Sequence, residues 1–158
     1  MDDRTDVKSP AQGRARYEHD LYSWAVEQAA LLRAGKIAEA DARNIAEELD
    51  DLGDEQCDKL ESALRLILLH LLKWDQQPER RSRSWRQSIE VQRRHFHKVL
   101  RKNPGLKPLV DEALNEAYAD ARLEAAGEID RDEHAFPAKC PYSLDVVLKR
   151  PIDWPPKD

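Results

Sequence analysis

The chain of 158 residues is poor in the residues that build β-sheets and disulfide frameworks. It has five glycines, two cysteines and an aromatic content of only 6%. Ala, Leu, Glu, Arg and Lys dominate instead, and these residues favour helices. The alternation of apolar and polar residues that is typical of strands does not occur, nor does an internal repeat. The composition therefore predicts a helical protein, and the length is typical of one domain.

Long apolar runs are also missing, and so is a pattern of paired cysteines. No uninterrupted apolar run reaches the ~20 residues that are needed to cross a bilayer. Residues 1–15 contain no apolar core of a signal peptide. Cys57 and Cys140 lie far apart and form no CxxC motif, which is typical of reduced cysteines in a cytoplasmic protein. We therefore expect a cytoplasmic protein with no membrane partner.

Apolar residues recur at helical spacing in four segments. The first covers residues 17–34, and Gly35 can end that helix. The second, from about 38 to 76, fits either one long helix with a weak point at Gly53 or two helices in line. We prefer one nearly continuous helix, in which Leu49 and Leu52 extend the buried stripe. Ser84 is the expected N-cap of a third helix that ends near Asn103. A fourth helix is expected over 108–127.

The two ends of the chain differ from these segments. Residues 1–16 have few apolar groups and predict a disordered lead-in. The tail is punctuated by prolines, and Ser143 is placed to cap a short helical turn at 144–149. We therefore predict an all-α, up-and-down helical bundle of about four main helices with an extended, proline-punctuated C-terminal tail. Residues 17–158 are expected to form a single domain that includes this tail.

Several strings of residues resemble one known family in their order along the chain. They are YEHDLYSWAVEQAALLRAG, NIAEELDDLG, LLHLLKWDQQP, SWRQSIEVQRR, NPGLKP, EAYADAR and FPAKCPYSLDVVL. The family is the bacterial domain of unknown function 29, and the resemblance covers about residues 17–154. Two departures are small: Gly105 stands where the family has a serine, and Gln76 and Gln77 precede Pro78 where an aromatic residue is common. The resemblance implies an all-helical bacterial protein and implies no activity.

His70 interrupts the most apolar passage of the chain, LRLILLHLLKWD at 64–75. Because buried polar groups are nearly always paired, we interpret it as a histidine that bonds to a carboxylate or a backbone carbonyl. Asp20, Glu47 and Glu48 are the expected partners. The alternative interpretation joins these four residues into a metal or acid–base site inside the bundle.

Known catalytic and metal motifs give the alternative no support. The chain contains no Glu-x-x-His pair, HExxH, P-loop or GxSxG motif. We therefore expect no metal and no other cofactor, and an enzyme is not favoured. Cys140 is expected to be a small packed residue, and Trp24, Trp74 and Trp85 are expected to pack between helices.

Charge is segregated along the chain. Residues 39–61 hold ten acidic residues against two basic ones, and residues 80–102 hold nine basic residues against one acidic one. One interpretation is that these helices are neighbours that pair their charges. The other is that a basic face of the third helix stays free for an acidic partner or nucleic acid. The candidate partner-binding residues are Arg86, Arg93, Arg94, Lys98 and Arg101.

These observations favour a small cytoplasmic interaction or regulatory protein without catalysis. It would act through helix faces on an unknown protein partner, and a homodimer is compatible with the sequence. Nucleic-acid binding through residues 80–102 is the alternative but is not favoured, because the acidic segment in the same small protein would repel a phosphate backbone. An enzyme built around Asp20, Glu47, Glu48 and His70 comes third.

Overall fold

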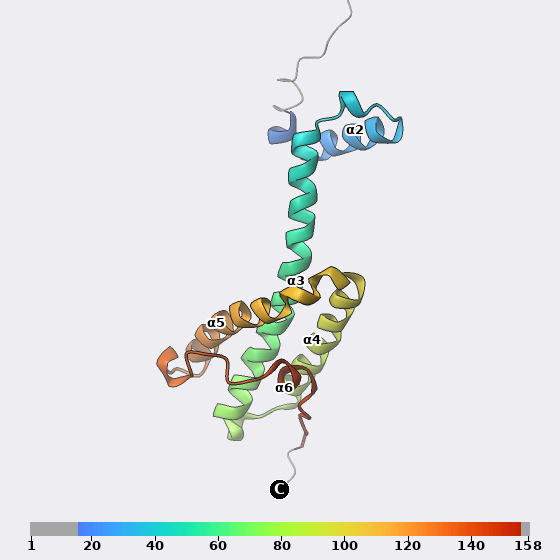
Figure 1. Cartoon of the computed structure of the whole chain (residues 1–158). Coiled ribbons are helices and arrows are strands. Elements are labelled where there is room, and N and C mark those ends of the chain that lie inside the picture. Colours follow the sequence, from blue (N-terminus) through green and yellow to red (C-terminus); the bar gives the residue numbers. More distant parts are fainter. Residues whose placement is uncertain (1–15, 156–158) are drawn as a thin grey trace, which may run out of the picture. The chain divides into compact units, whose positions relative to one another are not determined.

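A computed structural model describes residues 16–155 as helices joined by short connections (Figure 1). The main helices are α2 (Leu21–Arg33), α3 (Ala42–Gln76), α4 (Arg83–Lys102) and α5 (Val110–Glu128). The shorter elements are η1 (Ile37–Glu39), η2 (Pro78–Arg80), η3 (Pro104–Leu109), η4 (Glu133–Ala135) and α6 (Leu144–Lys149). No strand occurs among the described residues. The predicted all-α helical bundle of about four main helices is confirmed.

The chain divides into two compact units within α3, residues 1–53 and 54–158. We call the described parts, 16–53 and 54–155, the first and second units. α3 itself is one uninterrupted helix of 35 residues, which confirms the preferred interpretation of the second segment. The single domain expected over 17–158 stays a prediction. The expected disordered lead-in lies outside the described residues except for Arg16. None of the helices among residues 16–155 combines the length and apolar character that crossing a bilayer requires.

The core of the second unit surrounds the C-terminal half of α3. From Leu60 to Trp74 this helix is apolar around most of its circumference, so it must be covered on several sides. α4 and α5 flank it, and the tail crosses it (Figure 1). The contacts include Ile89 and Phe96 of α4 and Val147 of α6. Five alanines of α5 are buried in the same core and allow close packing: Ala113, Ala117, Ala121, Ala125 and Ala126.

The C-terminal tail is held by polar bonds as well as by apolar contacts. Arg150 donates two hydrogen bonds to the carboxylate of Asp75, at 2.7 and 2.8 Å, and the hydroxyl of Tyr142 donates a third at 2.7 Å. Tyr118 donates to the carbonyl of Pro137 at 2.6 Å. Burial alone would raise the pKa of Asp75, but the bonds from Arg150 and Tyr142 outweigh it and lower this pKa. The carboxylate therefore stays ionised and fixes the tail to the end of α3.

Helix ends show where local sequence signals were sufficient. Gly35 has a φ of +72° and ends α2 as predicted, with Lys36 N–H donating to the carbonyl of Leu31 at 2.9 Å. Ser143 caps α6 as predicted, since its hydroxyl accepts the N–H of Val146 at 3.3 Å. The predicted N-cap at Ser84 is wrong. Ser82 caps α4 instead, by accepting the N–H of Trp85 at 3.2 Å.

The helix predicted over 17–34 is interrupted at Asp20. Residues 16–19 form a helical turn, and α2 begins at Leu21. Asp20 leaves the helical region of backbone space, with φ −148° and ψ 75°, and its carboxylate accepts the N–H of Ser23 at 2.9 Å. An aspartate competes with the helix in this way by capping the next one. The same bonds to Ser23 lower the pKa of Asp20.

The first unit has almost no apolar core. Trp24 is the one hydrophobic side chain that is buried among residues 16–53, alongside Gln28 and Asn44. Tyr17 packs edge-on against Trp24, with ring centroids 4.8 Å apart. The stripe expected to be buried on α2 is largely uncovered, and the buried stripe predicted to run through Leu49 and Leu52 is wrong, because both side chains are exposed.

Polar bonds around Asp41 hold α2 against the start of α3. The Asp41 carboxylate accepts the indole N–H of Trp24 at 3.2 Å and the side-chain amide of Asn44 at 2.6 Å. The N–H of Asp41 donates to the side-chain oxygen of Gln28 at 2.8 Å. Tyr17 donates to Glu48 at 2.8 Å, and this bond raises the pKa of Tyr17 to about 12. The helical hairpin therefore depends on a polar network around a single indole.

We predict that Trp24→Ala unfolds the hairpin of the first unit. Removing a buried aromatic side chain costs about 3–5 kcal/mol, and no other buried hydrophobic residue of residues 16–53 compensates. Hydrogen–deuterium exchange of the α2 amides should become as fast as in an unfolded peptide. The control is Tyr22→Ala on the same helix, where the side chain is 80% exposed. Unchanged protection of α2 in Trp24→Ala would contradict the prediction.

Candidate functional site

His70 is a structural residue of α3. Its Nδ1 lies 2.8 Å from the carbonyl oxygen of Leu66, one turn earlier on the same helix. A carbonyl can only accept, so Nδ1 carries the proton in this arrangement. Burial lowers the pKa of His70, and the nearby Lys73 lowers it further, against the opposing effect of the Leu66 bond. The ring is therefore held neutral, as expected of a core histidine that bonds to a backbone carbonyl.

The predicted carboxylate partners of His70 are wrong. Glu48 lies on the same helix 22 residues earlier, which places it about 33 Å away along the axis, and Glu47 is one residue farther. Asp20 is exposed and caps α2. Glu48 accepts the hydroxyl of Tyr17, and Glu47 pairs with Arg43 at 3.7 Å. Each of the four residues therefore has a partner other than the one predicted.

Within residues 16–155, no three or more His, Cys, Asp or Glu side chains converge to hold a metal ion. A small notch is lined by Asp58, Glu61 and Asp120 together with Ser62 and Arg65. Burial, followed by the charge of Asp120, raises the pKa of Glu61. Arg65 also pairs with Glu124 of α5, so part of the local negative charge is neutralised.

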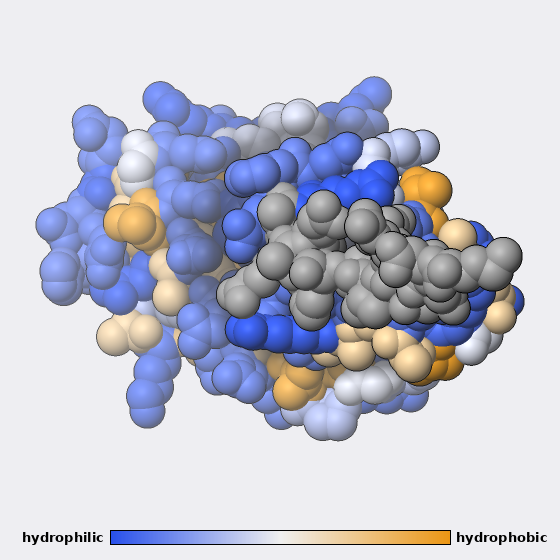
Figure 2. Space-filling view, turned by 90° about the horizontal axis from the view of Figure 1, so that it is seen from above, coloured by the Kyte–Doolittle hydropathy of each residue, from blue (hydrophilic) through white to orange (hydrophobic). Residues whose placement is uncertain are grey.

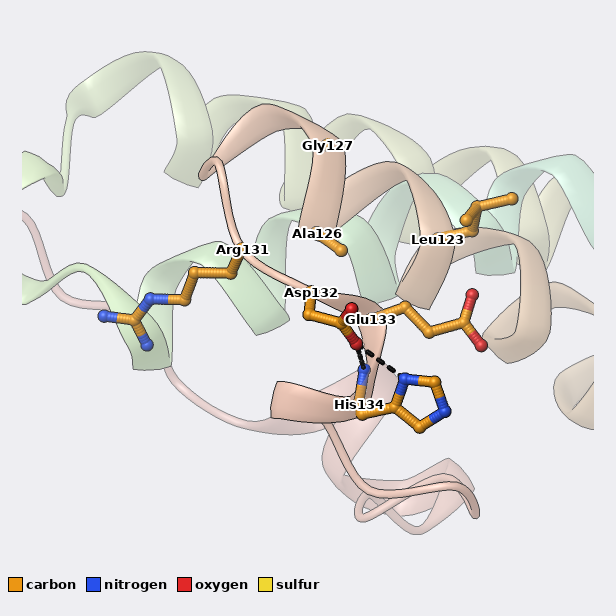
Figure 3. Close-up of a pocket in the computed structure, with 7 residues that line it drawn as sticks. All are labelled: Leu123, Ala126, Gly127, Arg131, Asp132, Glu133 and His134. Carbon is orange, nitrogen blue, oxygen red and sulfur yellow. Dashed lines mark hydrogen bonds and ion pairs between the residues drawn. The ribbon is translucent and has the colours of Figure 1, made fainter.

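An open depression lies at the C-terminal end of α5 (Figure 3). It is lined by Leu123, Ala126, Gly127, Arg131, Asp132, Glu133 and His134. Asp132 accepts both the N–H of His134 at 2.8 Å and a bond from its ring at 2.6 Å. The side chain of Arg131 points away from this pair and donates to Gln76. The Asp132–His134 contact is thus a local cap of η4, and the lining residues include no serine, threonine, cysteine or lysine.

Cys140 is half-buried, as its interpretation as a packed residue requires. Its Sγ lies 3.4 Å from the carbonyl oxygen of Tyr142. Burial raises the pKa of this thiol, so the neighbouring Lys139 does not activate it. Trp24 and Trp74 are buried as expected, and Trp85 is partly buried against the core with the Lys73 ammonium 4.6 Å from its ring centroid.

Arg93, one of the five candidate partner-binding residues, is buried in the structure. It is only 6% exposed. Its Nε donates to the carbonyl of Val147 at 2.9 Å, and Nη2 lies 3.4 Å from the carbonyl of Val146, both in α6. Nη1 pairs with Glu90 at 3.0 Å. The interpretation of Arg93 as a solvent-facing cation is wrong, because its guanidinium satisfies the carbonyls of α6.

The other four candidates lie on the outward face of α4. The single acidic residue of α4, Glu90, is partly buried. This face holds six exposed cations: Arg83, Arg86, Arg94, Lys98, Arg101 and Lys102. None of the six forms an ion pair with another described residue. The expected charge pairing is not seen within the second unit, where no ion pair joins residues 54–61 to α4. Lys73 and Arg65 of α3 pair with Glu128 and Glu124 of α5 instead.

The exposed apolar surface of the first unit was missed by sequence reasoning. Seven of the ten large hydrophobic residues that are exposed lie within residues 16–53: Leu21, Tyr22, Val26, Leu32, Ile37, Leu49 and Leu52. In the space-filling view, hydrophobic residues interrupt a surface that is otherwise mostly hydrophilic (Figure 2). The available signal was length, because a hairpin of this size has too few residues to cover every apolar position in its helices.

The features described so far define a small all-helical protein with a compact C-terminal core, a cationic helix face and an apolar N-terminal surface. The chain belongs to the family described as Domain of unknown function DUF29, whose model matches residues 16–152. This match confirms the predicted family and covers both units. No curated protein and no solved structure matches the chain.

We predict that His70 makes stability depend on pH. A histidine whose pKa is lower in the folded chain takes up its proton first in the unfolded chain. Its stabilising effect is therefore present above the unfolded pKa, near 6.5, and is lost as the pH falls below that value. The unfolding free energy of the wild type, relative to His70→Gln, should be greater at about pH 7.5 than at about pH 5. Urea denaturation followed by circular dichroism measures both. A difference that stays constant or grows towards low pH would refute this role.

We predict that Arg93→Met destabilises the second unit by about 1–3 kcal/mol, the cost of a buried hydrogen-bonding group left unpaired. Methionine fills similar space, but the Val147 carbonyl loses the donor that Arg93 supplies. The matched control is Arg94→Met on the exposed face, which should change stability by less than about 0.5 kcal/mol. Urea denaturation compares the two variants. Equal effects would show that the guanidinium contacts contribute nothing specific.

Proposed function

We propose that this protein is a non-catalytic interaction module of the cytoplasm that binds a protein partner through the apolar surface of its first unit. The observation that carries the proposal is the contrast in burial between the units. The second unit covers its apolar residues thoroughly, with three large exposed exceptions, whereas residues 16–53 bury one and expose seven. Exposed apolar surface of this kind is typical of protein-binding sites.

The architecture supports the same division of roles. In the second unit, α4, α5 and the tail pack around the C-terminal half of α3. The helix then continues into the first unit, where α2 is attached by the polar network around Asp41. The second unit has a well-packed core, and α3 joins it to a hairpin with little buried surface. Such a division is typical of a scaffold with a recognition element. Affinity would come from apolar contacts that the isolated chain leaves unmade.

A second candidate function is nucleic-acid binding through α4. Its supporting observation is the cationic face of that helix, whose six exposed cations form no ion pair with another residue of 16–155. Because Arg93 is buried, the candidate contacts to nucleic acid are Arg86, Arg94, Lys98 and Arg101. The face carries a single exposed apolar residue, Val91, and no tryptophan, tyrosine or phenylalanine on which bases could stack. Contacts of this type would be to phosphate and would not read sequence.

The proposed function predicts that position 49 touches another protein in the cells that naturally produce this chain. A photo-cross-linking residue in place of Leu49 should give a discrete cross-linked species on illumination. The same residue in place of Leu123, which is 60% exposed against 62% for Leu49, should give none. Equal labelling at both positions, or no adduct at 49, would refute the proposed function.

A further inference from the structure

The apolar surface of α3 in the first unit forms a narrow line along the helix. Ile45, Leu49 and Leu52 are spaced at i, i+4 and i+7, which places them within about 60° of one another around the axis. We call these three residues the α3 seam. Leu49 is 62% exposed and Leu52 is 55% exposed. Farther along the helix the same line continues as Leu60, Ile67 and Trp74, which α4 and α5 cover.

The helix is exposed on every side over the C-terminal part of the seam, whereas Ile45 is partly buried. Residues 49–55 are seven successive helical residues that are all exposed, and we call them the exposed stretch. They include four acidic residues and Gly53, which costs about 1 kcal/mol in a helix relative to alanine. Aspartate is also a weak helix former, and neighbouring carboxylates repel one another. The exposed stretch is therefore the part of α3 that gains most from a covering partner.

The charge around the seam selects the chemistry of that partner. Residues 16–53 contain nine acidic and four basic residues, a net charge of −5, whereas residues 54–158 contain 19 of each. All the net charge of the chain thus lies in the first unit. Helical spacing places Glu48 and Glu55 along one edge of the seam and Asp50 beyond the other.

Three occupants of the seam can be compared by apolar content and charge. A second copy that presented the same seam would bring acidic residues against acidic residues, which costs free energy. The α4 face of a second copy matches in charge but offers only Val91 as an exposed apolar residue. Residues 1–15 of the chain offer only Met1 and Val7 as larger apolar residues. None of these supplies both apolar contacts and positive charge.

We propose that the α3 seam binds a cationic amphipathic helix of another protein, with an apolar stripe on Leu49 and Leu52 and lysines or arginines against the surrounding carboxylates. This inference rests on the proposed function and names the chemistry of its partner. The partner helix would lie along α3 as helices pack in grooves, and apolar contacts would supply affinity. The charges would supply orientation and a fast encounter that weakens as salt is added.

Two synthetic helical peptides test the proposal on the full chain. Both carry leucines at i, i+3, i+4 and i+7, and the remaining positions are lysine in one and glutamate in the other. Fluorescence anisotropy should show that the lysine peptide binds at least about tenfold more tightly and that added salt weakens its binding. Hydrogen–deuterium exchange of residues 49–55 should slow when the lysine peptide is bound. Equal affinity for the two peptides would overturn the proposal.

Matched variants separate the seam from general attraction between a cation and an acidic protein. Leu49→Gln with Leu52→Gln keeps every charge and the helix propensity, and it should lose the lysine peptide. Leu123→Gln alters a residue of similar exposure in the second unit and should bind it as the wild type does. Unchanged protection of α2 amides will show that the double variant is folded. Retained binding in the double variant would overturn the proposal.

The two proposals fail in different ways. A cross-linked species at position 49 without binding of the lysine peptide would overturn the cationic partner and leave the interaction module standing. Absence of both would refute both. A dimer detected by analytical ultracentrifugation, strengthened by salt and lost in the double variant, would identify a second copy as the occupant and overturn the cationic helix.

Discussion

The C-terminal half of α3 imposes the constraint on which the rest of the second unit depends. A helix that is apolar around most of its circumference cannot face water on any broad side, so α4, α5 and the tail must all be present to cover it. The polar residues near this helix form hydrogen bonds and ion pairs within the unit. His70 donates a hydrogen bond to a carbonyl of its own helix, and Arg93 and Asp75 use their charges to hold α6 and the tail. The charges of Arg93 and Asp75 therefore serve the closure of the core.

The same helix meets the opposite conditions in the first unit. There its apolar positions remain uncovered and its charged positions are mostly acidic. The hairpin is stabilised by hydrogen bonds to Asp41 and by one buried indole, and most of its other large apolar side chains remain exposed. One continuous helix therefore joins a part whose contacts are complete to a part whose contacts are incomplete. This contrast is the physical basis for regarding the protein as a binding module.

Much of the fold follows from local patterns in the sequence. Periodicity and stop signals predicted the long α3, the end of α2 at Gly35 and the capped turn at Ser143, because each depends on residues within one or two turns. The error at Ser84 is small, since Ser82 and Ser84 are equally good caps and the choice depends on how α4 is placed against the core. Long-range facts escaped the same reasoning.

Arg93 and the α3 seam show why the candidate site was harder to predict than the fold. A pattern of hydrophobicity treats arginine as an outward residue, but Arg93 finds its acceptors 54 residues later in the chain. Leu49 and Leu52 lie on the same line of α3 as Leu60, although the polar Glu55 and Gln56 stand between them, and periodicity predicted burial for all three leucines. Only the three-dimensional arrangement shows where the covering helices stop. Amphipathic spacing shows that one face of a helix is apolar. It does not show whether another part of the same chain packs against that face.

The bond between Asp75 and Arg150 has a consequence for how the chain folds as it is made. Its two residues are 75 positions apart in the sequence, and Arg93 lies 54 positions before the Val147 carbonyl of α6 that accepts its bond. During synthesis the apolar surface of α3 emerges before the tail that closes it. Contacts of such long range form late, because the intervening loop must be ordered before they contribute. The second unit therefore completes its folding only after α6 and Arg150 have left the ribosome, and until then its core is open to aggregation.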